Sequence, residues 1–386
     1  MRNVKKYQIN KIPEVRFLGR NIKGVENTSG RVLFWNGSGF EVHFKGQELW
    51  ALVEADYSSL EPWIAIFLNG RINSRQMVTK GRHWICLARG FDNSYQSDIR
   101  VIKDSQPMTD DSKHFLKIHK LALSKGGQFE ALPESDLKIE FIGDSITTGE
   151  GLYGAVGDMD WISCHMSFSK TYAYQTATKL TADFRVMSQG GYGIVSAWNN
   201  NPYGIIPPHY EKVCSIVKNP QPGKLSAYEN LGGLQPYDFS IWQPDFIVIN
   251  LGTNDRGGFY QEPWIDPVSG NEYKMHLADN GKPSVEDGKK ITDGVNRFLS
   301  VVRKNNPCAK IIWATGMMCI PEVMPFINDG IEEYKNAFQD KNIFTLEFES
   351  MDIEQTDEDK GSRAHPGPLT HKLAAEKLCK FINSLR

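Results

Sequence analysis

The sequence predicts an α/β protein with an added all-β part: an N-terminal β-sandwich or jelly roll, followed by a three-layer α/β/α domain. Two patterns support this prediction. From Val15 to about Leu132, short apolar segments alternate with polar residues and helical periodicity is almost absent, which is typical of half-buried strands. After this region, short apolar strands alternate with helical segments, as in a parallel sheet covered by helices on both faces. A chain of 386 residues has room for about two to three domains.

The composition argues against two classes of partner. The formal net charge is -2, so the chain lacks the basic field that holds nucleic acid or an anionic membrane. No apolar run approaches the roughly 18 residues that span a bilayer, and the first segment, MRNVKKYQINKIPEVRF, lacks the apolar core of a signal peptide. We therefore expect a soluble, cytoplasmic protein, although a chain with a trimmed leader would look the same.

The cysteines predict neither a disulfide framework nor a zinc site. They are scattered, with no CxxC pair and no nearby histidine at metal-ligand spacing. We expect reduced and mostly buried thiols at all of these positions: Cys86, Cys164, Cys214, Cys308, Cys319 and Cys379.

The front end contains a clear hairpin signal. Apolar Phe40, Val42 and Phe44 alternate with polar neighbours, and the apolar strand that ends at Leu68 runs into Asn69-Gly70, a pair that favours a two-residue hairpin turn. Further strands are expected at Val32 to Trp35, Leu49 to Val53, Arg82 to Ala88, Ile99 to Ile102 and Phe115 to Leu123.

Four tryptophans fall at expected strand positions of the front end: Trp35, Trp50, Trp63 and Trp84. They would form a sugar-binding platform if exposed, but a core position is the favoured interpretation. Leu132-Pro133-Glu134-Ser135 breaks the strand pattern, so the predicted domains are 1–134 and 135–386.

The stretch from Lys138 to Gly149, KIEFIGDSITTG, places a serine at the end of a buried strand. Ligands collect at the carboxyl ends of strands in an open α/β sheet, because the loops form a crevice there and the next helix directs its N–H groups into it. Ser145 is therefore a candidate nucleophile. A hydroxyl is a weak nucleophile at neutral pH, so this role requires a base, a group that orients the base, and oxyanion donors.

The spelling Gly-Asp-Ser-Ile-Thr-x-Gly resembles block I of the GDSL-type SGNH hydrolases, whose serine attacks an ester carbonyl. In these enzymes block II supplies a glycine N–H to the oxyanion hole, and the matching turn here runs from Ser188 to Gly193. By spacing, Gly193 is the first choice and Gly191 the second. The usual asparagine of this block is replaced by Ser188, and a tight turn without chemistry is the alternative.

Residues 246–255, FIVINLGTND, resemble block III. The side chain of Asn254 is a neutral N–H donor, which can meet the developing oxyanion without the desolvation cost of a cation. A plain turn residue is the alternative.

Long segments without a strong pattern separate the blocks, from Ile194 to Trp242 and from Arg256 to Pro283. Connections of this length are uncommon unless they build a binding wall. Three aromatic residues in them are candidates for stacking on a sugar ring or for fixing the loops to the surface: Trp198, Tyr260 and Trp264.

The rest of the domain alternates strands and helices, which predicts about five parallel strands in flavodoxin-like order. Helices are expected at Phe168 to Leu180, Ser284 to Lys304 and around Ile331 to Phe338, and strands at Phe184 to Met187, Lys310 to Thr315 and Ile343 to Phe348.

Residues 364–370, AHPGPLT, open the last helix and resemble block V, in which a histidine before a proline lies over the serine. The resemblance selects His365 as the base. The family's usual Asp three residues earlier is Ser362 here, so either a displaced acid, Asp357 or Asp359, or a main-chain carbonyl must orient the imidazole. The carbonyl is the favoured alternative, because it fixes the tautomer without adding a charge. His371 is expected to be an ordinary helix residue.

Together, the β-sandwich, GDSIT, GTND and an AHP block without its upstream Asp resemble carbohydrate esterase family 2 over nearly the whole chain. The resemblance implies an acetyl xylan esterase-like serine esterase that removes O-acetyl groups from plant polysaccharides or sugars through an acetyl-enzyme, with a Ser145–His365 dyad. It implies an acetylated carbohydrate substrate and no metal or cofactor, and a homo-oligomer is left open. The rivals are an SGNH lipase or aryl esterase, and a non-catalytic carbohydrate-binding protein.

Overall fold

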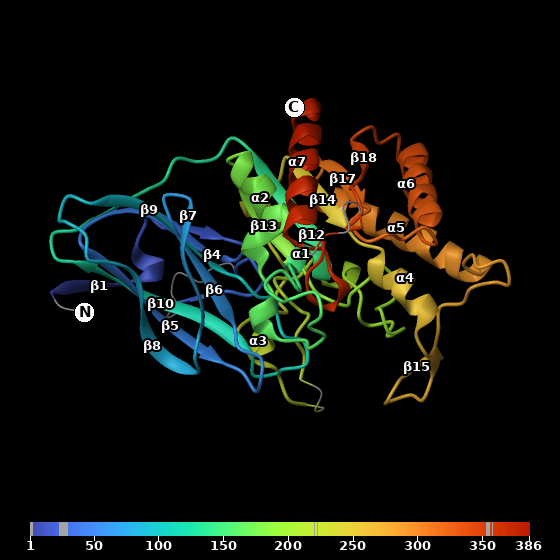
Figure 1. The fold of residues 1–386 in the computed structure, drawn as a ribbon, viewed down its shortest axis with the longest axis horizontal. Coiled ribbons are helices and arrows are strands. Elements are labelled where there is room, and N and C mark those ends of the chain that lie inside the picture. Colours follow the sequence, from blue (N-terminus) through green and yellow to red (C-terminus); the bar gives the residue numbers. More distant parts are fainter. Residues whose placement is uncertain (1–2, 23–29, 220, 222, 353–355, 357) are drawn as a thin grey trace.

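The computed structural model describes residues 3–22, 30–219, 221, 223–352, 356 and 358–386. Two bodies lie side by side in Figure 1, an all-β body formed by the first third of the chain and an α/β body formed by the rest. The last strand of the first body ends at Glu130, and the first strand of the parallel sheet begins at Lys138.

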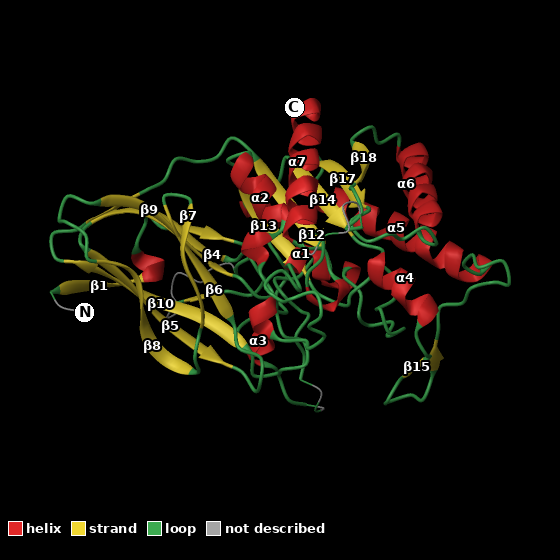
Figure 2. Cartoon of the chain, viewed as in Figure 1, coloured by secondary structure: helices red, strands yellow, loops and turns green. Residues whose placement is uncertain are grey.

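The first body is a sandwich of two antiparallel sheets (Figure 2). One sheet has the order β1-β10-β5-β8, with β3 on β10, and the other has the order β11-β4-β9-β6-β7, with β2 on β4. Their facing side chains share one apolar core. The strands are β1 Val4–Gln8, β2 Arg16–Leu18, β3 Arg31–Val32, β4 Gly39–Lys45, β5 Glu48–Asp56, β6 Trp63–Leu68, β7 Arg71–Met77, β8 Gly81–Arg89, β9 Gln96–Lys103, β10 Phe115–Ser124 and β11 Gln128–Glu130.

The predicted hairpin is confirmed. Strands β6 and β7 are joined by Asn69 and Gly70 alone, and both residues have positive φ, 47° and 74°. This is the turn geometry that matches the twist of the flanking strands.

The strand predicted from Val32 to Trp35 stops at Val32. Trp35 is fully buried, as favoured, but it packs in the core of the α/β body, where its Nε1 donates to the carbonyl of Val213 at 2.7 Å. Trp50, Trp63 and Trp84 are only half-buried.

The α/β body is built on five parallel strands in the order β13-β12-β14-β17-β18, the predicted flavodoxin-like order. Helices α2 and α7 cover one face, and α5 and α6 cover the other (Figure 2). The strands are β12 Lys138–Gly143, β13 Asp183–Ser188, β14 Phe246–Asn250, β17 Lys310–Thr315 and β18 Ile343–Glu347. The helices are α1 Ser145–Thr148, α2 Tyr172–Lys179, α3 Ala227–Asn230, α4 Thr253–Tyr260, α5 Val285–Asn305, α6 Met324–Phe338 and α7 Pro368–Leu385.

Two helix predictions are corrected. Helix α2 begins at Tyr172 because Thr171 caps it, its side chain accepting from the N–H of Tyr174. Helix α6 begins at Met324, one to two turns before the predicted start, with a proline in its first turn, where the missing N–H costs no hydrogen bond.

The two long segments also contain structure of their own. The segment after Ile194 holds α3, and the segment after Arg256 holds the end of α4 and a small hairpin, β15 Trp264–Ile265 with β16 Glu272–Tyr273.

Buried polar contacts join the two bodies. Arg20, at 0% exposure, donates from Nε and Nη2 to Glu140 Oε1 on β12. Lys103 Nζ donates to the hydroxyl of Tyr228 at 2.8 Å. These contacts replace the water that both bodies would otherwise bind at this surface, so the sandwich and the α/β body form one unit.

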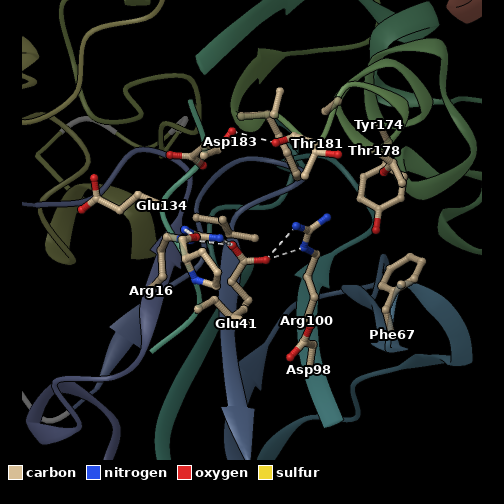
Figure 3. A pocket seen from close by; sticks show the side chains of 18 of the residues that line it. Arg16, Glu41, Phe67, Asp98, Arg100, Glu134, Tyr174, Thr178, Thr181 and Asp183 are labelled. Carbon is tan, nitrogen blue, oxygen red and sulfur yellow. Dashed lines mark hydrogen bonds and ion pairs between the residues drawn. The ribbon is translucent and has the colours of Figure 1, made fainter. Parts of the chain in front are cut away.

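A hollow of about 380 Å³ opens between the second sheet and the α2–β13 side of the α/β body (Figure 3). Glu41 lies at its centre between Arg16 and Arg100, and it accepts from both Nε atoms at 2.6 and 2.7 Å. Asp183, the first residue of β13, also lines it. The hollow therefore lies toward the amino ends of the parallel strands, and we call it the amino-end hollow.

The six cysteines form no disulfide with one another. The expectation of mostly buried thiols is wrong, since Cys214 alone is buried and Cys308 and Cys319 are exposed. Within the described ranges, no helix is both long and apolar enough to cross a bilayer.

Candidate active site

Three strand ends meet at the carboxyl edge of the sheet. The register pairs Gly143 of β12 with Ser188 of β13 on one side and with Asn250 of β14 on the other. The serine turn, the glycine turn and the Asn254 loop follow these three residues, so the parallel register brings three distant segments together.

Ser145 is the first residue of α1, directly after the sharp turn at Asp144 that follows β12. The side chain of Asp144 caps α1 by accepting from the N–H of Ile146 at 3.0 Å. Gly143 is needed because a Cβ there would lie 2.0 Å from Thr147 Oγ1. Ser145 is 5% exposed, and its N–H lies in the first helical turn, where N–H groups lack an intrahelical acceptor.

The structure brings His365 to Ser145 across 220 residues. The imidazole Nε2 lies 2.9 Å from Ser145 Oγ, which is within reach for proton transfer. His365 follows the short 3-10 segment Ser362–Ala364 and precedes α7.

The other ring nitrogen contacts the main chain. His365 Nδ1 lies 2.9 Å from the carbonyl oxygen of Arg363. When Nδ1 carries the hydrogen and donates to this carbonyl, Nε2 has a free lone pair that faces the serine. Arg363 and Ala364 both adopt left-handed backbone, with φ of 56° and 54°, which costs about 1 kcal/mol or more each.

The displaced-acid alternative finds no support at Asp359. Its carboxylate accepts from the N–H and hydroxyl of Thr356 at 2.7 and 3.0 Å. Asp357 lies outside the described residues. Ser362, at the family position of the acid, is fully buried and donates its N–H to the carbonyl of Gly151.

Asn254 is in the first turn of α4 and borders the same cavity as Ser145. Its Nδ2 donates to the carbonyl of Tyr192 at 2.8 Å and makes a longer contact of 3.3 Å with Asp144 Oδ2. The first bond fixes the amide, and the second, longer one directs its other hydrogen to the carboxyl group of Asp144 in the serine turn.

The structure corrects the prediction that Gly193 is the oxyanion donor of the glycine turn. The N–H of Gly193 donates to the carbonyl of Gly204 at 3.1 Å, and Gly193 does not border the cavity in the described structure. Gly193 therefore joins the turn to the following loop. Gly191, the second choice, borders the cavity and has φ of 80°. Gly190 also borders the cavity, and its N–H donates to Gln106 Oε1 at 2.8 Å.

Two buried carboxyls underlie the site. Burial raises the pKa of Asp144 to about 7, and the nearby carboxyls of Asp255 and Glu150 contribute in the same direction. Burial also raises the pKa of Asp255, although its carboxylate accepts from the N–H groups of residues 194–196, which oppose this shift. Both side chains shape the turns, since each accepts from backbone N–H groups of a turn.

The catalytic cavity has a volume of about 740 Å³. Of the three predicted aromatic residues, Trp198 borders it and is 49% exposed. Tyr260 and Trp264 are not among its described lining residues. Tyr260 donates its hydroxyl to Glu322, and Trp264 packs on Tyr203 with ring centroids 5.9 Å apart.

Sequence reasoning missed several lining residues. Trp161 and Tyr203 border the cavity, and so do Thr109 and Asp110 of the sandwich. An aromatic residue in a glycine-rich loop after the serine was the available signal for Trp161. No local pattern marks Thr109 and Asp110, because only the packing of the two bodies brings them to the site.

His371 is a structural residue. It is fully buried, and its Nδ1 accepts from the N–H of Tyr172 at 3.0 Å, which joins α7 to the start of α2. Burial lowers its pKa to about 3, so it stays neutral. The prediction of an ordinary helix residue missed this contact.

No cluster of three or more His, Cys, Asp or Glu side chains arranged to hold a metal occurs in the described part of the chain. The expectation that no metal or cofactor takes part stays a prediction. The described groups are those of acyl transfer: a hydroxyl, an imidazole in contact with it, and N–H donors.

Comparisons with known proteins agree with this geometry. The family model for GDSL-like Lipase/Acylhydrolase matches residues 139–378. An acetyl xylan esterase (Est2A) from the rumen bacterium Butyrivibrio proteoclasticus is 37% identical, with a TM-score of 0.92 over 99% of this chain and 98% of that one. A family two carbohydrate esterase from Clostridium thermocellum, in complex with cellohexaose, is 24% identical, with a TM-score of 0.74 over 96% of this chain and 99% of that one.

Among curated proteins, the cellulase/esterase CelE of Acetivibrio thermocellus is 24% identical over 360 residues. The match covers 91% of this chain but 37% of that protein. The present chain therefore corresponds to one part of a longer relative.

Proposed function

The chain belongs to the GDSL-like lipase/acylhydrolase family, and from this premise we propose that it is a serine esterase that removes O-acetyl groups from plant cell-wall polysaccharides or oligosaccharides, as acetyl xylan esterases do. The main observation behind the proposal is the contact series from Ser145 Oγ to His365 Nε2 and from His365 Nδ1 to the Arg363 carbonyl, each 2.9 Å long.

In the first step, Ser145 Oγ bonds to the acetyl carbonyl carbon while its proton passes to His365 Nε2. The carbonyl electron pair moves to oxygen and forms the oxyanion. When this intermediate collapses, the sugar oxygen leaves and takes the proton from Nε2, and the acetyl group stays on Ser145.

The oxyanion is held by N–H donors rather than by a cation. The donors are the N–H of Ser145, the amide of Asn254 and the N–H of Gly191, since the N–H of Gly190 already donates to Gln106. Support for this assignment is that all three residues border the catalytic cavity. Such donors are most effective when they are fixed before the charge develops, and Asn254 is fixed by its bond to Tyr192.

In the second step, water gives a proton to His365 Nε2 as its oxygen attacks the acetyl group. The new oxyanion collapses, acetate leaves, and Ser145 Oγ regains the proton. The Arg363 carbonyl keeps the imidazole in the same tautomer in both steps, because it continues to accept from Nδ1.

The cavity supports a carbohydrate substrate. Trp161, Trp198 and Tyr203 border it together with many polar residues, and such a mixture provides flat apolar surfaces for sugar rings and polar partners for hydroxyls. The substrate named for Est2A, acetyl xylan, is consistent with this lining.

The test is acetate release from defined mono-acetylated sugars and from acetylated xylan, by the wild-type chain and by Ser145→Ala. We expect release by the wild type and its loss in Ser145→Ala, while polysaccharide binding persists. Faster hydrolysis of 4-nitrophenyl esters with longer acyl chains than of any acetylated sugar would instead support the lipase or aryl esterase alternative. Equal release by both proteins would contradict a serine mechanism.

A further inference from the structure

Glu150 lies in the catalytic cavity beside the base, and the mechanism above does not use it. Its N–H donates to the carbonyl of Ser145 at 3.1 Å, so its backbone is joined to the nucleophile turn. The residue is 6% exposed, and it borders the same cavity as Ser145 and His365. A carboxylate with so little water around it needs partners.

One carboxylate oxygen of Glu150 has a fixed partner and the other does not. Arg363 Nε donates to Oε1 at 2.9 Å, and Arg363 is itself held by a bond from Nη1 to the carbonyl of Met159 at 2.8 Å. No hydrogen bond reaches Oε2 in the described part of the chain, and its one ion-pair contact there is with His365 Nε2 at 3.9 Å, which is too long for a hydrogen bond. An ionised carboxylate accepts about four hydrogen bonds, so Oε2 retains accepting capacity.

The glycine turn leaves space for this oxygen. A Cβ on Gly190 would lie 3.0 Å from Glu150 Oε2 and 3.1 Å from Gln106 Oε1. A larger residue at position 190 would therefore press on the carboxylate. Oε2 thus lies near both the base and the glycine turn.

The position of the leaving group follows from the chemistry. Its oxygen must come within roughly 2.6–3.2 Å of His365 Nε2 to receive the proton, and Glu150 Oε2 lies 3.9 Å from the same nitrogen. A hydroxyl on the carbon adjacent to the one that bears the ester oxygen can then come within hydrogen-bonding reach of Oε2.

We propose that Glu150 accepts a hydrogen bond from a free hydroxyl of the leaving sugar, on the carbon adjacent to the one that bears the acetyl ester, and so selects acetyl esters of polyhydroxy compounds. This inference rests on the proposed esterase function and deepens it. A hydrogen bond to a charged acceptor is stronger than a neutral one. An ester without the hydroxyl places an apolar group against the carboxylate, and a buried charge without its partner is costly.

The rival explanation is that Glu150 only positions Arg363, whose carbonyl orients His365. In that case loss of Glu150 disturbs the imidazole and slows every ester by the same factor. The two roles therefore differ in a ratio of rates between substrates rather than in a single rate.

The experiment measures kcat/KM on three esters: a methyl xyloside with one acetyl group and a free neighbouring hydroxyl, its deoxy counterpart without that hydroxyl, and 4-nitrophenyl acetate. For the wild type, we expect the hydroxylated xyloside to react at least about tenfold faster than its deoxy counterpart. Glu150→Gln, which keeps the size and an oxygen for Arg363, should reduce this preference by about tenfold or more.

Two further variants complete the design. Glu134→Gln removes a negative charge from an exposed position outside the catalytic cavity and should keep the wild-type preference. Glu150→Asp keeps the charge but withdraws it by one carbon. It should also lose the preference, and it carries the test if Glu150→Gln does not fold.

An unchanged preference in both Glu150 variants, with all three esters slowed equally, would overturn the inference and assign Glu150 to positioning Arg363. A wild type that hydrolyses both xylosides equally well would overturn the inference alone. A wild type that cleaves 4-nitrophenyl acetate but no acetylated sugar would overturn both the inference and the proposed function.

Discussion

Two hollows lie at opposite ends of the parallel sheet, and they differ in how fully their charged side chains are hydrogen-bonded. In the amino-end hollow, Glu41 is saturated by Arg16 and Arg100. In the catalytic cavity, Glu150 Oε2 lacks a described hydrogen-bond donor, and the one described hydrogen bond of His365 Nε2 is with the hydroxyl of Ser145. Both hollows combine polar and apolar residues from both bodies. Both hollows contain charged side chains, so charge alone does not distinguish the catalytic one. The difference is that the catalytic cavity contains polar atoms that can still form hydrogen bonds.

The largest expected effect is loss of the reacting pair. Ser145→Ala and His365→Gln should each lower kcat by about 10⁴- to 10⁶-fold, because the nucleophile and its base act as one unit. The double variant should be hardly slower than either single one. Acetate release at saturating substrate measures this, and additive losses would contradict the shared role.

The next largest effect concerns the oxyanion. Asn254→Ala should lower kcat by about 10²- to 10³-fold with little change in KM, because the donor meets charge that develops only in the transition state. Steady-state kinetics on an acetylated xyloside would show this. A rise in KM with kcat preserved would instead mean that Asn254 binds the ground state.

Disruption of the amino-end hollow should affect folding and leave the chemistry intact. Glu41→Gln removes the charge that Arg16 and Arg100 share, and it should lower the free energy of unfolding by about 1 to 3 kcal/mol. Urea denaturation measures this change. Glu134→Gln, an exposed lining position of the same hollow, is the matched control and should stay within about 0.5 kcal/mol of the wild type. A fall in kcat for Glu41→Gln would break the contrast between the hollows.

The smallest effect is a pH dependence of stability beneath the catalytic cavity. Burial raises the pKa of Asp144 from 3.8 to about 7, so between these values the folded state binds a proton that the unfolded state has lost. The contribution of this group to stability is therefore fully present below pH 3.8 and is lost as the pH rises toward about 7.

Asp144→Asn removes this penalty, so its melting temperature relative to the wild type should be higher at pH 8 than at pH 4, by about 2 to 4 °C. Differential scanning calorimetry at the two pH values measures the change. A relative melting temperature that is the same at pH 4 and pH 8 would mean that Asp144 ionises at its ordinary pKa in the folded protein.

Much of this arrangement could be predicted from the sequence, because it depends on local patterns. Blocks I to III each follow a buried strand, and parallel strands end at the same edge of the sheet, so the positions of Ser145, the glycine turn and Asn254 after these strands imply that they lie close together. The Asn69-Gly70 hairpin and the sheet order follow from equally local signals.

The remaining features depend on packing and could not be predicted. Spacing favoured Gly193, but it does not reveal that the carbonyl of Gly204 already occupies this N–H. Asp110 reaches the catalytic cavity, and Gln106 the glycine turn beside it, only because Arg20 and other buried side chains join the sandwich to the α/β body. Glu150 follows the serine motif directly, yet its pairing with Arg363 crosses 213 residues.

The use of a peptide carbonyl to orient the imidazole has an evolutionary consequence. A triad acid can be lost by a single codon change, whereas every amino acid brings a carbonyl to position 363. A substitution can therefore displace the carbonyl of residue 363 only by changing the backbone angles of residues 363 and 364. Selection should then act at these two positions on backbone conformation, and should retain residues that tolerate left-handed geometry instead of an acid.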